Sequence, residues 1–230
     1  MTTLPFKDRT QAGKQLAQAL SAYAGRADVV VLALPRGGVP VGFAVAEALG
    51  VELDILEVRK IGMPGHAEYA VGAVGAGGVR VLQAGVIEAG LVTKEQIEAA
   101  TARELREIER RERLYRAGRP PPVLEGRCVI LVDDGIATGA TLRAAVEVAR
   151  RSNVARLVVA APVGAADSVA AIEPEVDDMV CLATPSHFHA VSQWYRHFDQ
   201  TSDEEVQDLL TLAWRQQALG APRPSSHGSQ

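Results

Sequence analysis

Apolar residues in this chain gather into short continuous runs, and the segments between the runs carry helical patterns. The runs share a length of six to nine residues and lie at 28–34, 51–58, 128–133, 155–163 and 177–184. Such runs are typical of strands that are buried on both faces of a parallel sheet. Their alternation with helical segments predicts an α/β fold, with a parallel sheet flanked by helices.

Helix-start signals support this pattern. Asp8 followed by Gln11 indicates a helix that runs to about residue 23, and Thr93 with Gln96 forms a capping-box pattern. The second signal opens a long charged helix that ends near residue 116, whose alternating arginines and glutamates favour a solvated or packing face. Further helices are expected over residues 40–49, 139–151 and 164–174, and from residue 202 onward.

The segment between the second apolar run and the long helix has a different composition. Residues 61–90 are rich in glycine and contain short β-like pieces such as "AVGAV" and "GVRVL". They predict a mobile flap that contains a hairpin. We therefore expect a single domain over residues 1–219, with the flap and long helix inserted at about 61–118. The polar tail at 220–230 is expected to be disordered.

Composition narrows the class of protein. A chain of 230 residues with 47% apolar residues can bury one sizeable core, and its net charge of −4 argues against a nucleic-acid partner. Cys128 and Cys181 lie in apolar runs, which is typical of buried thiols in a reducing compartment. The sequence has no signal-peptide pattern and no apolar run of roughly 20 residues. We therefore expect a cytoplasmic protein with no membrane partner.

The stretch "VILVDDGIATGAT" contains the strongest chemical signal. Asp133 and Asp134 fall at the carboxyl end of a predicted strand, where ligands bind in open parallel sheets. The start of the next helix offers unpaired N–H groups to a phosphate, and Thr138 and Thr141 add hydroxyl donors. The carboxylates would repel a phosphate but can accept hydrogen bonds from the hydroxyls of a ribose. The pattern therefore favours a 5′-phosphorylated sugar as the ligand.

Three other interpretations of this stretch carry less weight. A P-loop NTPase would need a G-x-x-x-x-G-K-[ST] loop, which the chain lacks. A dinucleotide-binding fold would need G-x-G-x-x-G after the first strand, where the chain has "PRGG". A purely structural pair of acids before an ordinary turn remains open, although the threonine spacing argues against it.

The stretch resembles the ribose-phosphate signature of the type I phosphoribosyltransferases, in which an apolar strand and two acids precede a loop ending in T-G-x-T. "PRGG" at 35–38 resembles that family's pyrophosphate loop, and "VRKIGMPG" at 58–65 resembles a stretch of adenine phosphoribosyltransferases. In loop motifs the chain is similar to adenine- and uracil-type enzymes, and in order and spacing the similarity covers roughly 28–198. Gly135 departs from the usual aliphatic residue, which leads us to expect added loop flexibility.

The resemblance implies a Rossmann-like phosphoribosyltransferase core and a pentosyltransferase activity within nucleotide metabolism. Such an enzyme moves ribose 5-phosphate from phosphoribosyl pyrophosphate (PRPP) to a nucleobase nitrogen and releases pyrophosphate. It also implies Mg²⁺, held mainly by PRPP oxygens, with Asp133 and Asp134 assisting through water. A homodimer is expected on the same ground.

The resemblance further implies roles for individual residues. The loop that would hold the 5′-phosphate consists of Ala137, Thr138, Gly139, Ala140 and Thr141. The groups that would hold pyrophosphate are Arg36, Gly37, Gly38, Arg59 and Lys60. Asp133 and Asp134 would accept the ribose hydroxyls and stabilise positive charge on the sugar. Lys60 would neutralise pyrophosphate, and Glu68 on the flap is a candidate general base.

The acceptor base stays open. Ala137 stands where hypoxanthine-guanine enzymes carry an aspartate, and alanine there resembles adenine and uracil enzymes. The base pocket would come from residues 184–200, called the hood, in which Phe188 either stacks on the base or packs in the hood.

The resemblance also implies a cis peptide in the "PRGG" loop, between Arg36 and Gly37. A non-catalytic PRPP- or nucleotide-binding regulator on the same fold is the alternative function, and a nucleoside phosphate hydrolase or kinase of another α/β class has less support.

Overall fold

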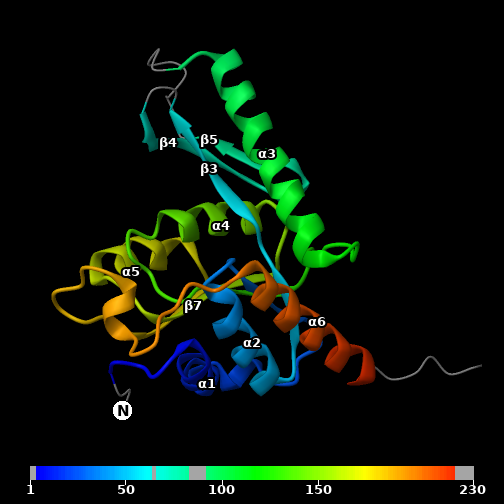
Figure 1. Ribbon diagram of the computed structural model, residues 1–230, viewed down its shortest axis with the longest axis vertical. Helices are drawn as coiled ribbons and strands as arrows, with labels where there is room; N and C mark the ends of the chain where they lie inside the picture. The colour runs from blue at the N-terminus through cyan, green and yellow to red at the C-terminus, as the bar shows by residue number, and fades with distance from the viewer. Residues whose placement is uncertain (1–3, 64–65, 83–91, 221–230) are drawn as a thin grey trace, which may run out of the picture.

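A five-stranded parallel sheet forms the centre of the protein. The computed structural model describes residues 4–63, 66–82 and 92–220 (Figure 1). The strands follow the order β2-β1-β6-β7-β8. Their bounds are β1 Val29–Ala33, β2 Glu52–Ile55, β6 Cys128–Val132, β7 Arg156–Val163 and β8 Asp178–Ala183. This sheet confirms the predicted parallel α/β fold.

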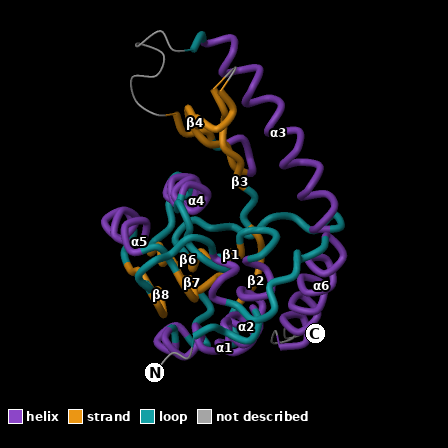
Figure 2. Tube along the Cα trace, turned by 60° about the vertical axis from the view of Figure 1, so that its left-hand side comes forward, coloured by secondary structure: helices purple, strands orange, loops and turns teal. Residues whose placement is uncertain are grey.

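Helices cover both faces of the sheet (Figures 1 and 2). One face carries α1 (Arg9–Ala19), α2 (Gly38–Leu49) and α6 (Asp203–Gly220), and the other carries α4 (Ala140–Arg150) and α5 (Ala166–Ile172). Val31 of β1 packs in the core of the first face, while Val30 and Leu32 pack in the core of the second. Because neighbouring side chains point to opposite faces and both faces are covered, the strands are continuously apolar.

A second, antiparallel sheet forms the flap. Its strands are β3 (Val58–Met63), β4 (His66–Gly75) and β5 (Arg80–Leu82), in that order across the sheet. The long helix α3 (Lys94–Arg116) packs on β3 and β4 through a separate apolar cluster that includes Ile61, Val74 and Ile108. Flap residues 64–65 and 83–91 lie outside the described part, as does the expected tail at 221–230. The predicted flap mobility stays a prediction.

The strand expected over 51–58 is divided between the two sheets. Ile55 is the last residue of β2 paired with β1, and Val58 already pairs with Gly75 of β4. An apolar run continues through this change of partner, so its pattern does not reveal the break. Arg59 and Lys60 consequently lie on the flap strand β3 rather than at the end of the central sheet.

The helix-start signals match the observed caps. The Asp8 side chain accepts a hydrogen bond from the Gln11 backbone N–H at 2.8 Å, and Thr93 with Gln96 forms a complete capping box. The Glu205 N–H donates to Ser202 Oγ at 3.0 Å at the start of α6. Short 3₁₀ helices occupy Ser21–Tyr23, Ala76–Gly78, Glu173–Glu175 and Val191–Trp194. None of the helices within the described ranges is long and apolar enough to cross a membrane.

The beginning of the chain pairs with the hood. The Phe6 N–H donates to the Trp194 carbonyl at 2.8 Å, and the Arg196 N–H donates to the Phe6 carbonyl at 2.8 Å. Phe6 and Tyr195 are buried together in an apolar cluster that also contacts Phe188. The N-terminal segment and the hood therefore form one unit, which no pattern in the sequence indicated.

Candidate functional site

The two acids lie directly beyond the central strand of the parallel sheet. β6 ends at Val132, and Asp133 and Asp134 follow it. The Asp134 backbone N–H donates to Asp133 Oδ1 at 2.8 Å, which fixes the turn between the two side chains. Asp133 and Asp134, called the acid doublet from here on, therefore occupy the sheet edge at which a ligand was expected.

The "PRGG" loop lies against this doublet, because β1 and β6 are neighbouring parallel strands and their loops leave the same edge. A Cβ atom on Gly37 would overlap Asp134 Oδ2, and one on Gly38 would lie 2.7 Å from the Val132 carbonyl oxygen. Only glycine permits this close approach at both positions. The cis peptide of the loop joins Pro35 to Arg36, one bond before the expected position.

The predicted phosphate loop encloses a pocket at the start of α4. Residues 135–142 and Asp133 line this pocket of about 120 Å³. Ile136 anchors the loop to the end of β7, since its N–H donates to the Val163 carbonyl at 2.9 Å. Gly139 caps α4 with φ +70°, a conformation that favours glycine. The residues assigned to the 5′-phosphate thus line one pocket, while their binding role stays a prediction.

The unusual Gly135 has a packing explanation. A Cβ atom there would lie 2.5 Å from Val191 Cγ1 of the hood. The Tyr195 hydroxyl also donates to the Asp134 carbonyl at 2.6 Å. The small residue lets the hood pack directly onto the acid loop, residues 133–141, and the loop flexibility that we expected from Gly135 stays a prediction.

Arg9 is the residue of this site that sequence reasoning missed. Its Nε donates to Asp134 Oδ2 at 2.8 Å, and its Nη1 donates to the Asp199 carbonyl at 2.8 Å. Its guanidinium carbon lies 3.8 Å from the centre of the Phe198 ring. The only signal nearby was the helix start at Asp8, which placed Arg9 in the first turn of a helix but gave no indication of its partner 125 residues away.

Burial sets the ionisation of the doublet. It raises the pKa of Asp133 well above the ordinary value, and the neighbouring Asp134 charge raises it further. Burial also raises the pKa of Asp134, but the Arg9 charge and hydrogen bond oppose that rise. Asp134 is therefore the member of the pair whose charged form is favoured by a hydrogen-bonded cation, although its pKa stays above the ordinary value.

The side chains of the basic residues assigned to pyrophosphate have different neighbours. Arg36 Nη1 lies 3.7 Å from Asp203 Oδ1 at the start of α6. Arg59 Nε donates to Glu104 Oε2 of α3 at 2.6 Å. Lys60 lines a pocket of about 180 Å³ beside the start of α4. Their common role in binding pyrophosphate stays a prediction.

Two further candidates complete the set. Phe188 stacks on Trp194 within the hood, with ring centroids 6.3 Å apart, so packing accounts for part of its contacts. Glu68 belongs to β4, but its side chain lies outside the described residues. The two roles proposed for these residues, base stacking and proton transfer, stay predictions.

The donor set around the doublet fits only a metal that is shared with a ligand. The described part of the chain contains no group of three or more His, Cys, Asp or Glu side chains that could hold an ion. Asp133 and Asp134 provide two adjacent carboxylates, one of which is engaged by Arg9. This arrangement fits Mg²⁺ bound mainly through substrate oxygens and water.

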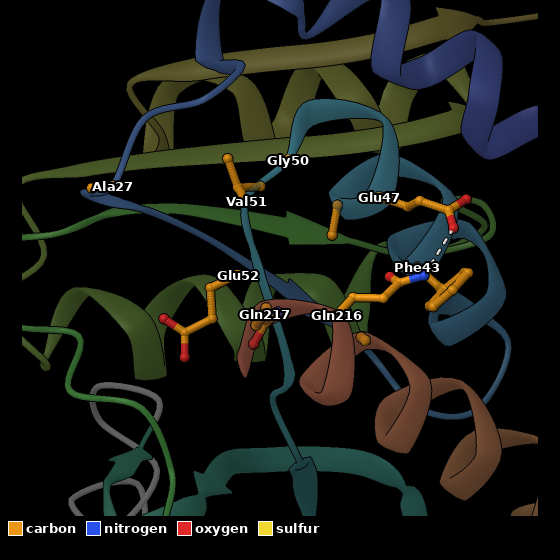
Figure 3. A pocket seen from close by; sticks show the side chains of 10 residues that line it. Ala27, Phe43, Glu47, Gly50, Val51, Glu52, Gln216 and Gln217 are labelled. Atoms are coloured by element: carbon orange, nitrogen blue, oxygen red, sulfur yellow. Dashed lines mark hydrogen bonds between the residues drawn. The ribbon is translucent and has the colours of Figure 1, made fainter. Parts of the chain in front are cut away.

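A larger cavity lies at the opposite end of the strands. It measures about 670 Å³ and is bordered by α2, the start of β2 and the last turns of α6 (Figure 3). Within it the Gln216 side-chain amide donates to Glu47 Oε1 at 3.4 Å. The cavity does not include the residues of the acid loop, and size alone does not make it the functional site.

Comparisons with known proteins agree with this geometry. The family described as "Phosphoribosyl transferase domain" matches residues 6–197. Two Mycobacterium tuberculosis proteins, from strains CDC 1551 / Oshkosh and H37Rv, each carry the name "Putative phosphoribosyl transferase" and are 49% identical over 210 residues. These alignments cover 91% of this chain and 47% of theirs, so the chain spans about half the length of the curated relatives it matches.

A solved structure is similar over almost its whole length. The crystal structure of the protein TT1426 from Thermus thermophilus superposes with a TM-score of 0.81 at 41% identity, covering 89% of this chain and 97% of that one. The family match spans the acid loop, the "PRGG" loop and most of the hood. The chain belongs to the phosphoribosyl transferase domain family.

Proposed function

We propose that the protein transfers ribose 5-phosphate from PRPP to a nucleobase nitrogen and releases pyrophosphate. One observation carries this proposal: the acid doublet lies between the "PRGG" loop and the pocket at the start of α4, all at one edge of the sheet. PRPP has a sugar diol between a phosphate and a pyrophosphate. The three parts of the site match the three parts of that molecule in kind and order.

Each part of the site has a role in binding. Backbone N–H groups at the start of α4, with the hydroxyls of Thr138 and Thr141, hold the 5′-phosphate. Asp133 and Asp134 accept hydrogen bonds from the ribose hydroxyls. Arg36 and the backbone of the glycine loop hold the pyrophosphate, and Lys60 adds a positive charge from the flap. Arg59 contributes less, because Glu104 already engages it.

The same groups favour the transfer step. The bond between the sugar C1 and the pyrophosphate oxygen breaks, and its electron pair leaves with pyrophosphate while positive charge develops on the sugar. The carboxylates lie close to this charge and stabilise it more in the transition state than in the ground state. The base nitrogen then bonds to C1 and loses its proton to a general base, for which Glu68 is the candidate. Bound Mg²⁺, held by PRPP oxygens and through water by the doublet, would supply charge neutralisation for the departing pyrophosphate.

The flap and hood protect this chemistry from water. The flap carries Lys60 and Glu68, and its closure over the sugar would prevent hydrolysis from competing with transfer. The hood supplies the base pocket, where Phe188 is placed to stack on the acceptor. We place this activity in the cytoplasm, in nucleotide metabolism and in a homodimer, as the family resemblance implies.

A base panel tests the proposal. The protein is mixed with PRPP, Mg²⁺ and each of several purine and pyrimidine bases, and both pyrophosphate and nucleotide are measured. Equal amounts of nucleotide and pyrophosphate with at least one base would support the transfer. PRPP binding by calorimetry without turnover of any base would contradict it and favour the regulatory alternative. Absence of PRPP binding would contradict the transfer and would leave only a regulator that binds another nucleotide.

A further inference from the structure

Arg9 is built into the site by three contacts from different parts of the chain. It begins α1, bonds to Asp134 after β6, and lies on Phe198 while it donates to the Asp199 carbonyl in the hood. The Arg9 and Asp134 side chains are only 12% and 14% exposed. A guanidinium held on three sides offers its Nε–H in one fixed direction.

These contacts determine which oxygen of Asp134 remains available. Oδ2 accepts from Arg9 and lies against the Gly37 backbone. No described residue donates a hydrogen bond to Oδ1. Tyr195 fixes the backbone of the same residue from the hood side. Asp134 therefore presents Oδ1 as an acceptor, in an orientation set by residues that lie behind it.

The two acids differ in their charge partners. Asp133 has no ion pair within the described ranges, and its Oδ1 accepts the Asp134 backbone N–H. Asp134 alone has a guanidinium at ion-pair distance. Because adjacent carboxylates repel each other, the Arg9 guanidinium at 2.8 Å offsets part of the cost of placing Asp134 beside Asp133.

We propose that Arg9 is a positioning residue for phosphoribosyl transfer, which acts through Asp134 by orienting its carboxylate toward the ribose hydroxyls. This inference rests on the proposed function. Arg9 itself does not contact PRPP in this scheme. The titratable and charged groups that face Asp134 are Arg9, Asp133 and Tyr195. Burial raises the pKa of Tyr195, so its phenol stays neutral.

Substitution of Arg9 tests the inference through the split of its effect between kcat and KM. Arg9→Gln should lower kcat about 10- to 100-fold, the range seen when an orienting partner is removed. The KM for PRPP should change by less than kcat, because the groups that hold the phosphate and the pyrophosphate stay intact. Arg9→Lys should restore only part of the rate, because an ammonium cannot reproduce the fork of contacts.

Arg26 provides a matched control. It also pairs with an aspartate, Asp28, at 2.7 Å and lies over an aromatic ring, Tyr23, at 5.7 Å, but it is remote from the acid loop. Arg26→Gln should leave both kcat and KM unchanged. A kcat in Arg9→Gln that equals that of Arg26→Gln, or a loss that lies wholly in KM, would overturn the inference while leaving the proposed function intact.

A binding measurement separates the inference from the function on which it rests. If the unaltered protein binds PRPP but turns over no base, the function fails, and Arg9 is tested by comparing the affinity for PRPP with that for inorganic pyrophosphate, which has no ribose hydroxyls. Arg9→Gln should then weaken PRPP binding more than pyrophosphate binding, and equal effects on the two ligands would overturn the inference. Phe198→Leu, which removes the supporting ring without changing any charge, should give the same pattern with a smaller loss, and it serves if Arg9→Gln does not fold.

Discussion

Two buried carboxylates differ in how closely an arginine approaches them. Asp134 lies at the edge of the central sheet, and Glu57 lies where the chain passes from the central sheet to the flap. Asp134 lies 2.8 Å from Arg9 Nε. Glu57, between β2 and β3, lies 4.0 Å from Arg111 Nη1, and its Oε1 has no hydrogen-bond partner in the described part of the chain. Burial raises the pKa of Glu57 to about 7.

The comparison shows that burial alone does not determine how a carboxylate can be used. A close, hydrogen-bonded guanidinium opposes the cost of burying the Asp134 charge, so that this group can serve a ligand. Around Glu57, the arginines have closer partners elsewhere: Arg59 binds Glu104 and Arg111 binds Glu107. The flap therefore meets the core through ion pairs that leave Glu57 with only a distant cation, whereas Arg9 hydrogen-bonds directly to the acid that the proposed chemistry uses.

The largest expected effect is on catalysis by Asp134→Asn. The exchange keeps the shape of the side chain but removes the charge that stabilises the sugar cation, so we expect a barrier increase of about 2–4 kcal/mol in kcat. Steady-state pyrophosphate release measures it. The same carboxylate-to-amide exchange at Glu57 should cause no comparable loss, and equal losses in both variants would remove the distinction between the two regions.

Glu57→Gln should instead affect the free energy of unfolding, because it removes a buried charge that has only a distant partner. Below pH 4.5 the Glu57 carboxyl is protonated in both the folded and the unfolded protein, and between pH 4.5 and pH 7 it ionises only in the unfolded protein. Above pH 7 it is ionised in both, and the folded protein carries the full cost of the buried charge. The variant should therefore gain up to about 3 kcal/mol over the unaltered protein between pH 4.5 and pH 8. The charged groups that face Glu57 are Arg111, Arg59, Glu107 and Glu112.

Urea unfolding at pH 5 and pH 8 measures this difference. A constant difference in unfolding free energy between the two proteins at both values would show that Glu57 does not titrate as its burial requires. The rate of pyrophosphate release, followed in parallel, distinguishes an effect on folding from one on the site.

Gly38→Ala should damage the functional edge by crowding. The new methyl group would lie 2.7 Å from the Val132 carbonyl oxygen, which belongs to a rigid central strand, so we expect a loss of about 1–3 kcal/mol in unfolding free energy. At Gly37 the methyl group would meet the Asp134 carboxylate, which can move only by giving up its hydrogen bond to Arg9. Gly37→Ala should therefore cost less stability and more PRPP affinity, and the reverse order would contradict the placement of the loop.

Thr141→Val gives the smallest expected effect. Loss of one hydroxyl donor should weaken ribose 5-phosphate binding by about 1 kcal/mol, measured by calorimetry. A change confined to base affinity would contradict the phosphate assignment. Thr101→Val on α3 is the matched control from the flap region: its buried hydroxyl has no partner in the described structure, so affinity should stay unchanged and stability should be equal or greater.

Local signals in the sequence predicted a large part of this molecule. The continuous apolar runs predicted the parallel sheet, and the Thr93–Gln96 pair predicted the start of α3, because both signals are patterns that span only a few residues. The family resemblance assigned the acid loop and the "PRGG" loop to one ligand. The two loops do lie together, because neighbouring parallel strands place their carboxyl ends along one edge.

What the sequence determined by itself was the set of strands, the principal helices and the two loops that identify the family, since each is specified by neighbouring residues. The tertiary structure alone decided that β2 ends at Ile55, that Val191 packs on Gly135, and that Arg9 binds Asp134 while Glu57 lacks a close partner. These features join residues far apart in the chain, and whether a buried charge is compensated depends on ångström distances that no local pattern encodes.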